Sequence, residues 1–232
     1  MPHLRAILAL ILTLAASSPA FATAEHKYGK GEYAIITGGR APNGKYSVAA
    51  HGEGDAGSEN FRLSLMAEPG HRKLATLDNV NDDNILDSAP DAFHATWSSD
   101  SRYVAVSFRS ERHIVTLNLY AIDGKSAKLV DGPDLFRDAT SRIVDRANDG
   151  DMRTSVPALT WLAPRRFHLT DDRVFVEDDA TLADKLGALG KAAKMDDGRV
   201  SIQFSAEADC DIGNANAISI GKLQPGKFPF QE

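Results

Sequence analysis

The stretch that most constrains the fold is residues 93–130, where short apolar runs alternate with polar turns. The tract HATW, the turn SSDS and the run RYVAVSF predict two antiparallel strands. A charged loop at 109–112 precedes a third strand at 114–120, and the Asp123-Gly124 hairpin signal leads to a fourth at 127–130. The stretch therefore predicts one four-stranded antiparallel meander.

The second strand of this meander is apolar on both of its faces. In the run Tyr103 to Phe108 only Ser107 is polar. A strand with one face in water alternates apolar and polar residues, whereas a continuous apolar run indicates a strand that is covered on two sides. We therefore expect Trp97, Tyr103, Val104 and Val106 in the core.

A similar pattern occurs earlier in the chain. Residues 41–49 align on residues 98–106 with an offset of 57, and Arg62 to Met66 matches Thr116 to Tyr120. The loop His51 to Asn60 (HGEGDAGSEN) is longer than its counterpart, so we expect it to project from the sheet and to be dispensable for folding. These matches predict a second meander in the N-terminal half.

The C-terminal half shows weaker signals. Residues 160–169 lie in register with residues 96–105, and further strands are expected at 174–176, 198–205 and 217–221. Apolar stripes predict a helix over Asp134 to Asn148, and Thr181 begins a second helix with a capping pattern. We expect both helices to cover a sheet.

The tract TWSSDSRYVAVSF resembles the W-S-P-D-G-K-x-I-A-F tract in the blades of bacterial periplasmic propellers, such as those of the Tol translocation system. Ser99 and Ser101 replace the usual Pro and Gly, which Pro42 and Gly44 supply in the first unit. The tract NGKYSVAAHGEGDAGSENFRL also resembles a group of small uncharacterised exported proteobacterial proteins. These resemblances imply a blade-like fold, and no activity.

Closed propellers usually need four to eight blades, and only two or three units fit this chain. Two alternatives follow: a small or irregular propeller-like sheet stack that helices close, or completion of the ring by self-association. The predicted fold class is therefore mostly β, with antiparallel four-stranded blade-like meanders, small or incomplete as a propeller, and one or two short helices. We expect one such domain over residues 25–232.

The N-terminus has the pattern of a cleavable secretory signal over residues 1–24. A positive start ending at Arg5 precedes the apolar run Ile7 to Ala16, which is too short for the roughly 20 residues of a membrane span. Cleavage motifs at 20–22 and 22–24 place the mature start at Thr23 or Glu25. A periplasmic or secreted protein without a transmembrane segment is expected.

The net charge limits the classes of binding partner, and the cysteine content limits the disulfides that the chain can form. Loss of Arg5 with the signal leaves 25 basic against 32 acidic residues, a formal charge of −7, which argues against nucleic acid. Cys210 is the single cysteine, so the fold has no internal disulfide to rely on. We expect Cys210 to be a small buried hydrophobe, although a free thiol or an intermolecular bridge are the alternatives.

The candidate binding residues gather at one predicted edge. His51, Glu53, Asp55 and Glu59 lie in the glycine-rich loop, whose oxygen ligands would suit a hard cation such as calcium, although the spacing is not that of an EF-hand. If the two units are equivalent, these residues share their edge with a second group: Arg109, Glu111 and His113. The expected ligand at this edge is a protein or a small molecule.

Motifs of catalysis are missing from the sequence. The chain contains no HExxH, GxSxG, P-loop, GxGxxG or CxxC tract. We therefore predict an exported periplasmic binding or interaction module without catalytic or metal-ligating residues. The alternative is a periplasmic hydrolase with an unrecognised His/Asp site.

Overall fold

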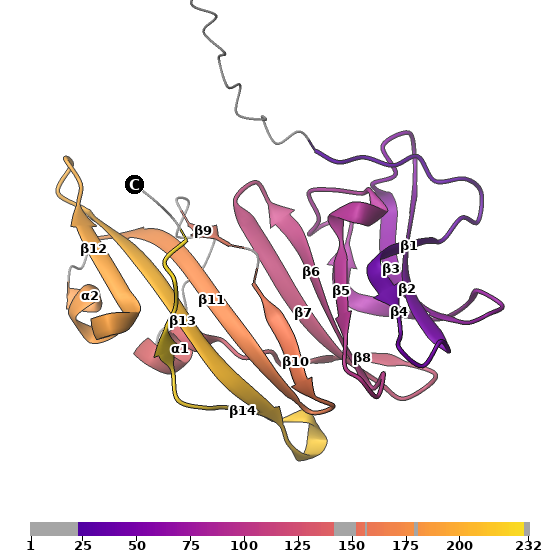
Figure 1. The fold of residues 1–232 in the computed structure, drawn as a ribbon. Helices are drawn as coiled ribbons and strands as arrows, with labels where there is room; N and C mark the ends of the chain where they lie inside the picture. The colour runs from indigo at the N-terminus through magenta and orange to yellow at the C-terminus, as the bar shows by residue number, and fades with distance from the viewer. Residues whose placement is uncertain (1–22, 142–151, 156, 179–180, 230–232) are drawn as a thin grey trace, which may run out of the picture.

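A computed structural model describes residues 23–141, 152–155, 157–178 and 181–229, and it confirms a mostly β fold with two short α-helices (Figure 1). The first eight strands are β1 (Ala34–Arg40), β2 (Tyr46–Glu53), β3 (Glu59–Ala67), β4 (Arg72–Asn81), β5 (His94–Trp97), β6 (Tyr103–Glu111), β7 (Ile114–Ile122) and β8 (Ala127–Val130). The remaining strands are β9 (Arg153–Thr154), β10 (Leu159–Ala163), β11 (Arg166–Glu177), β12 (Gly190–Lys194), β13 (Val200–Ile212), β14 (Ile218–Ile220) and β15 (Gln224–Pro225). The helices are α1 (Leu135–Thr140) and α2 (Thr181–Leu186), with 3-10 turns at Pro90–Ala92, Gly187–Leu189 and Asn214–Asn216.

The first sheet consists of two four-stranded antiparallel meanders in the order β4-β3-β2-β1-β5-β6-β7-β8. Strands β1 and β5 pair in parallel at Thr37 and His94, which joins the two meanders edge to edge. Across the remaining gap, the Tyr120 hydroxyl of β7 donates a hydrogen bond to the Asp78 carbonyl of β4 at 2.5 Å. The meanders therefore share one nearly closed, barrel-like sheet, whereas the blades of a propeller are separate sheets.

The interior of this sheet is filled by aromatic side chains from both meanders. Phe93 stacks between Phe61 of β3 and Phe108 of β6, with ring centroids 5.1 and 5.9 Å apart. Trp97 is buried, and its indole N–H donates to the Gly39 carbonyl at 3.1 Å. The expected burial of Trp97, Tyr103, Val104 and Val106 is confirmed.

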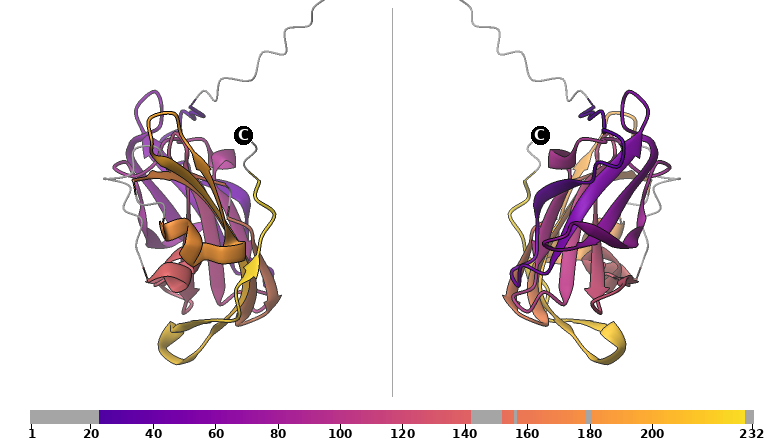
Figure 2. Two further views of the ribbon diagram at one scale, coloured as in Figure 1. Left: turned by 90° about the vertical axis from the view of Figure 1, so that its left-hand side faces the viewer. Right: turned by 90° about the vertical axis from the view of Figure 1, so that its right-hand side faces the viewer.

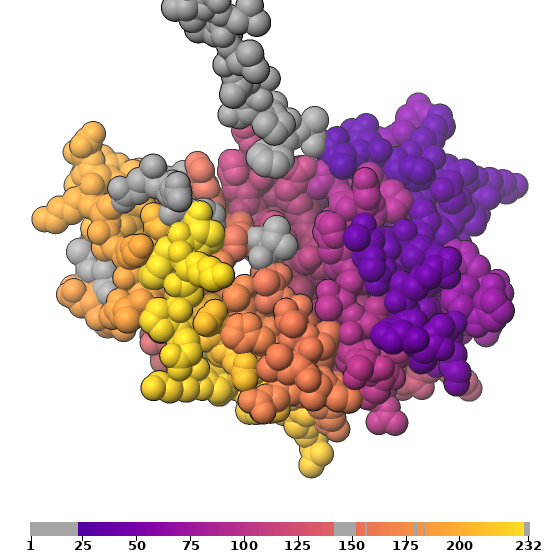
Figure 3. All heavy atoms as spheres, viewed as in Figure 1, coloured from indigo at the N-terminus to yellow at the C-terminus, as the bar shows by residue number. Residues whose placement is uncertain are grey.

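The second sheet has the core order β10-β11-β13-β12, and the long strands β11 and β13 pair along their whole lengths. The predicted strand pair at 160–169 is the hairpin of β10 and β11. Strand β10 lies next to β5, where the Trp161 indole donates to the Thr96 carbonyl at 3.1 Å. Figure 3 shows the two parts of the chain in contact along this line.

Both predicted helices are present and lie together against the second sheet (Figure 2). Asp134 caps α1 by accepting a hydrogen bond from the Arg137 N–H at 3.0 Å. Phe136 packs edge-on against Phe175 and Phe204, each at 5.2 Å between ring centroids. The predicted helix over 134–148 ends at Thr140 as far as the structure describes it, because residues 142–148 lie outside the described ranges.

Strands β6 and β7 are buried on both faces, as the apolar run of β6 predicts. Val104 and Val106 point into the barrel-like sheet, while Tyr103 and Ala105 belong to a second core. That second core lies between β6–β7, the inner face of the second sheet and the two helices. Cys210 is fully buried in it, as expected, and burial raises the pKa of its thiol to about 11.

None of the helices in the described part of the chain combines the length and the hydrophobicity that crossing a membrane requires.

His71 ties the turn between β3 and β4 to the segment that precedes β1. Its Nδ1 lies 2.9 Å from a Glu68 carboxylate oxygen, and its Nε2 lies 2.8 Å from the Tyr33 carbonyl oxygen. Both partners are acceptors, so both ring nitrogens donate when the imidazole is protonated. The hydrogen bond to Glu68 is the main reason that the pKa of His71 is raised above its ordinary value.

This link predicts a pH-dependent stability. A histidine whose pKa is higher in the folded state stabilises the fold fully below its unfolded pKa, near 6.5, and loses that contribution as the pH rises through the folded pKa. We expect His71→Ala to lower the melting temperature clearly at about pH 6 and progressively less toward about pH 9. The control is His94→Ala, which removes an exposed histidine of β5. An equal loss for His71→Ala at every pH would show that His71 acts only by packing.

Candidate functional site

The predicted binding residues lie at one end of the first sheet. Strands β2 and β6 are antiparallel to β1 and β5, and β1 and β5 run parallel, so β2 and β6 point the same way. The hairpins β2–β3 and β6–β7 therefore emerge at the same end. The first group of predicted residues is His51, Glu53, Asp55 and Glu59, and the second is Arg109, Glu111 and His113.

The first group is held largely by contacts that support the fold. The His51 ring stacks on Tyr33 with centroids 4.8 Å apart, and its Nδ1 lies 2.5 Å from the Glu32 carbonyl oxygen. Glu53 accepts a hydrogen bond from Asn60 at 2.8 Å and is paired in register with Glu59. The carboxylate of Asp55 forms an ion pair with Lys27. Both of these side chains are largely exposed, so this pair adds little stability.

The glycine-rich loop is exposed at its tip, Glu53 to Asp55, but another part of it is packed, which the expectation of a freely projecting loop did not include. Gly52 and Gly57 are buried, and a Cβ at Gly57 would lie 1.9 Å from the His26 carbonyl oxygen. The Ser88 hydroxyl donates to the Ala56 carbonyl of the same loop. The loop therefore packs against the N-terminal segment, an interaction that strand patterns do not reveal.

Arg109, in the second group, forms a bidentate ion pair with Asp87. Its Nε and Nη2 lie 2.8 and 2.5 Å from the two carboxylate oxygens, and both side chains are at most 18% exposed. Asp87 also accepts a hydrogen bond from the Ala24 N–H at 2.7 Å. The pair therefore helps to anchor the segment around Ala24.

The other two residues of the second group lie at the β6–β7 turn. Glu111 ends β6 and pairs in register with Ile114. The His113 carbonyl accepts a hydrogen bond from the Thr154 N–H at 2.9 Å, which connects the turn to β9. Residues 86–89 lie between the two groups, because Asp87 binds Arg109 and Ser88 binds the loop of Asp55. The two groups thus border one connected segment.

No group of three or more histidine, cysteine or acidic side chains among the residues that the structure describes is placed to hold a metal ion. His168 of β11 has an acidic neighbour, since its Nδ1 lies 2.9 Å from Asp209, but both side chains are more than one third exposed. The Arg166 guanidinium lies 2.8 Å from the same carboxylate. Hydrogen bonds from His168 and then Arg166 hold the pKa of Asp209 below its ordinary value.

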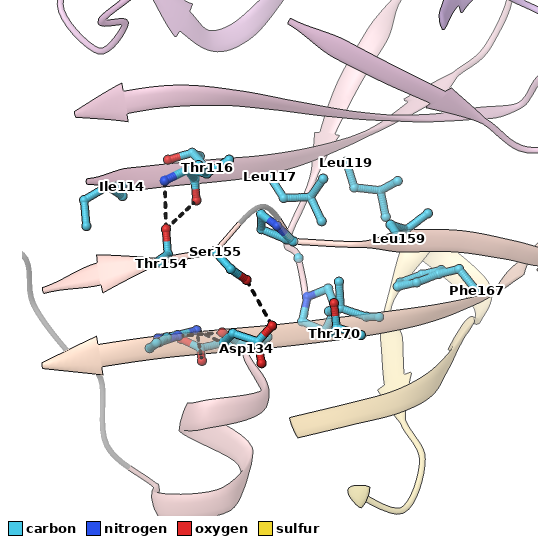
Figure 4. A pocket seen from close by; sticks show the side chains of 18 of the residues that line it. Ile114, Thr116, Leu117, Leu119, Asp134, Thr154, Ser155, Leu159, Phe167 and Thr170 are labelled. Atoms are coloured by element: carbon cyan, nitrogen blue, oxygen red, sulfur yellow. Dashed lines mark hydrogen bonds and ion pairs between the residues drawn. The ribbon is translucent and has the colours of Figure 1, made fainter. Parts of the chain in front are cut away.

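The best-formed cavity lies elsewhere, between β7 and β11, and has a volume of about 270 Å³ (Figure 4). Its walls come from three stretches of the chain: 114–119, 132–134 and 152–173. The apolar part is lined by side chains of β7, β10 and β11, namely Ile114, Leu117, Leu119, Leu159, Phe167 and Leu169. The sequence did not indicate this cavity, because each lining residue lies in a pattern that is typical of an ordinary strand or loop.

One end of the cavity carries an ionic network centred on Arg173. Its Nε and Nη2 lie 2.8 and 2.7 Å from the two oxygens of Asp171, and Nη2 lies 2.7 Å from Asp134. The guanidinium also lies over the Phe136 ring, 5.5 Å from its centroid. Asp171 and Arg173 are about 15% exposed. Burial raises the pKa of Asp171, and the charge of Arg173 opposes that shift.

A third carboxylate, that of Asp172, borders the same cavity. It accepts a hydrogen bond from Ser155 at 3.0 Å and another from Ser205. The nearby Thr154 hydroxyl accepts from the Val115 N–H at 2.7 Å and donates to the Val115 carbonyl at 3.2 Å (Figure 4). These bonds tie Thr154 to β7 and Ser155 to β11, the two walls of the cavity.

No known family model, curated protein or solved structure matches this chain.

The packing of the glycine-rich loop predicts that adding a methyl group at Gly57 lowers the stability of the fold. Gly57→Ala places a Cβ against the His26 carbonyl and the Tyr28 ring, and the residue has φ of +64°. Gly44→Ala is the matched control, since Gly44 has φ of +66° with open space around it. Both variants carry left-handed strain of about 1–2 kcal/mol, and we expect Gly57→Ala to cost about 1–3 kcal/mol more. Chemical denaturation measures this, and equal losses would mean that the loop is not packed in solution.

Proposed function

We propose that this protein is an exported periplasmic binding module that holds a small molecule in the cavity between β7 and β11. The observation that carries the proposal is the mixed lining of this cavity. Binding sites for small molecules are usually preformed hollows with apolar walls and a few fixed polar groups. Leu117 and Phe167 supply apolar surface, and Asp172 and Arg173 supply fixed polar groups.

The polar side chains of the cavity favour binding over hydrolysis. A hydrolytic site needs a nucleophile within reach of a base that can take its proton. The Thr154 hydroxyl donates a hydrogen bond to the Val115 carbonyl, and the Ser155 hydroxyl donates one to the Asp172 carboxylate. No histidine occurs among the described residues that line the cavity. The Ser155 hydroxyl donates to a carboxylate, which is a weak base, so the second candidate, a hydrolase, is supported less well than binding.

Export is supported by the N-terminal sequence, and the hydrogen bonds of Ala24 bear on the position of cleavage. The apolar run Ile7 to Ala16 and the small residues after it are typical of a secretory signal. Ala24 takes part in the fold, because its N–H donates to Asp87 and its carbonyl accepts from the N–H groups of Ser88 and Ala89. Cleavage after Ala24 would remove these three hydrogen bonds, whereas cleavage after Ala22 keeps them.

We therefore expect the exported protein to begin at Thr23. Intact-mass measurement and N-terminal sequencing of the protein from a periplasmic fraction distinguish this start from Glu25. Deleting Thr23 and Ala24 from a protein expressed without its signal should lower the melting temperature, because the buried Asp87 carboxylate loses one of its donors. A mature protein that starts at Glu25, or one that still starts at Met1, would contradict this expectation.

Binding in the cavity is tested by filling it. Leu117→Phe and the larger Leu117→Trp reduce the volume from the β7 wall, and Leu129→Trp is the control on the exposed surface of β8. Native mass spectrometry of the periplasmic protein should show a small molecule that the two Leu117 variants lack and the Leu129 variant keeps. Added ligand at about 100 times its Kd should stabilise the wild type by about 2.7 kcal/mol. A wild type without any ligand, or Leu117 variants that bind as well as wild type, would disprove this site.

A further inference from the structure

We infer that the cavity between β7 and β11 binds a primary organic ammonium ion with a compact hydrocarbon body. This inference rests on the proposed binding function and specifies the chemistry of the ligand. It follows from the balance of charge at one end of the cavity, from the hydrogen bonds that are already made there and from the apolar wall opposite.

The charged end of the cavity is negative. Asp134 and Asp171 contribute two carboxylates beside the single guanidinium of Arg173, and Asp172, whose side chain lies on the opposite face of β11, adds a third carboxylate to the lining. Arg173 contacts both Asp171 and Asp134 within 2.8 Å, so its positive charge is already paired with these two carboxylates. In a partly buried site such an excess is costly unless a cation offsets it.

An anionic ligand is disfavoured by the same network. To bind Arg173, a carboxylate or a phosphate would have to displace Asp171 or Asp134. Displacing Asp171 would leave a largely buried carboxylate, 14% exposed, without its partner. Displacing Asp134 would disturb the cap of α1, because Asp134 also accepts the Arg137 N–H. The guanidinium is therefore a structural group and not an anion receptor.

Asp172 is the group best placed to receive the cation. Its two oxygens accept hydrogen bonds only from the neutral hydroxyls of Ser155 and Ser205 among the contacts described, and no cationic side chain is recorded within ion-pair distance. A carboxylate oxygen has more than one lone pair, so Asp172 accepts further donors. A primary ammonium group carries three N–H donors and matches this demand, while a quaternary ammonium group carries none.

The wall opposite the charged end determines the rest of the ligand. Leu117 and Leu119 of β7 lie across the cavity from Leu159 and Phe167 of the second sheet (Figure 4), and Leu169 also lines it. A hydrocarbon body there gains about 25 cal/mol for each Å² of apolar surface removed from water, whereas a sugar or a peptide backbone would leave polar groups unpaired. The volume of about 270 Å³ limits this body to a small one.

The test compares three probes with the same six-carbon chain: hexylamine, hexanol and hexanoate. Calorimetric titration of the wild-type protein at about pH 7 should show hexylamine binding at least about tenfold more tightly than hexanol, with hexanoate weakest. Asp172→Asn removes the charge while keeping the shape, and it should lower hexylamine affinity about tenfold without changing hexanol binding. Asp196→Asn removes an exposed carboxylate remote from the cavity lining and should leave all three affinities unchanged.

The outcomes separate this inference from the proposed function. Tightest binding of hexanoate or hexanol, or an Asp172→Asn variant that binds hexylamine as the wild type does, would overturn the ammonium assignment and leave the cavity as a binding site for another class of molecule. If none of the three probes binds and the periplasmic protein also carries no small molecule, both proposals fail. Melting temperatures of the two variants near that of the wild type show that any loss of affinity is not a loss of fold.

Discussion

The burial of β6 and β7 on both of their faces is the constraint on which the rest of the structure depends. One face completes the interior of the barrel-like sheet, where Val106 and Tyr120 lie, and the other face forms the second core with Tyr103 and Leu119. An apolar face that is left in water would cost about 25 cal/mol for each Å² exposed. The second sheet is therefore needed to cover the first, and neither core is complete without this hairpin.

The same logic explains why the two meanders share a sheet. Each of them alone would present unpaired edge strands and an uncovered aromatic face. The parallel contact of β1 with β5 removes one pair of edges, and the stack of Phe61, Phe93 and Phe108 joins the two halves inside. At this junction Gly38 has φ of +67°, and a Cβ there would lie 2.2 Å from the Ala95 carbonyl oxygen. The close approach of the two strands thus requires a glycine.

Ionic groups have different roles at two places beside the β6–β7 hairpin. At the end with the glycine-rich loop, the pair of Asp87 and Arg109 holds the N-terminal segment in place. In the cavity, Arg173 holds Asp171 and the cap of α1. The first pair has its charges balanced one to one and explains why Arg109 supports the fold. The second network has more carboxylates than cations beside an apolar wall, and this imbalance distinguishes a candidate binding site from a structural ion pair.

Local patterns in the sequence predicted the four strands of the second meander, the two inner strands β2 and β3 of the first, the hairpin at 160–169, the starts of both helices and the two-sided burial of β6. The outer strands β1 and β4 of the first meander were not predicted. The predicted features depend on neighbours a few residues apart, where alternation, turn residues and caps act directly. The sequence also placed the two groups of predicted site residues at one end of the sheet. The tertiary structure alone decided that the meanders join edge to edge, that Gly57 packs against His26, and that Leu117, Asp134 and Asp172 border one cavity. Those outcomes depend on contacts between residues far apart in the chain, for which a single sequence carries no local signal.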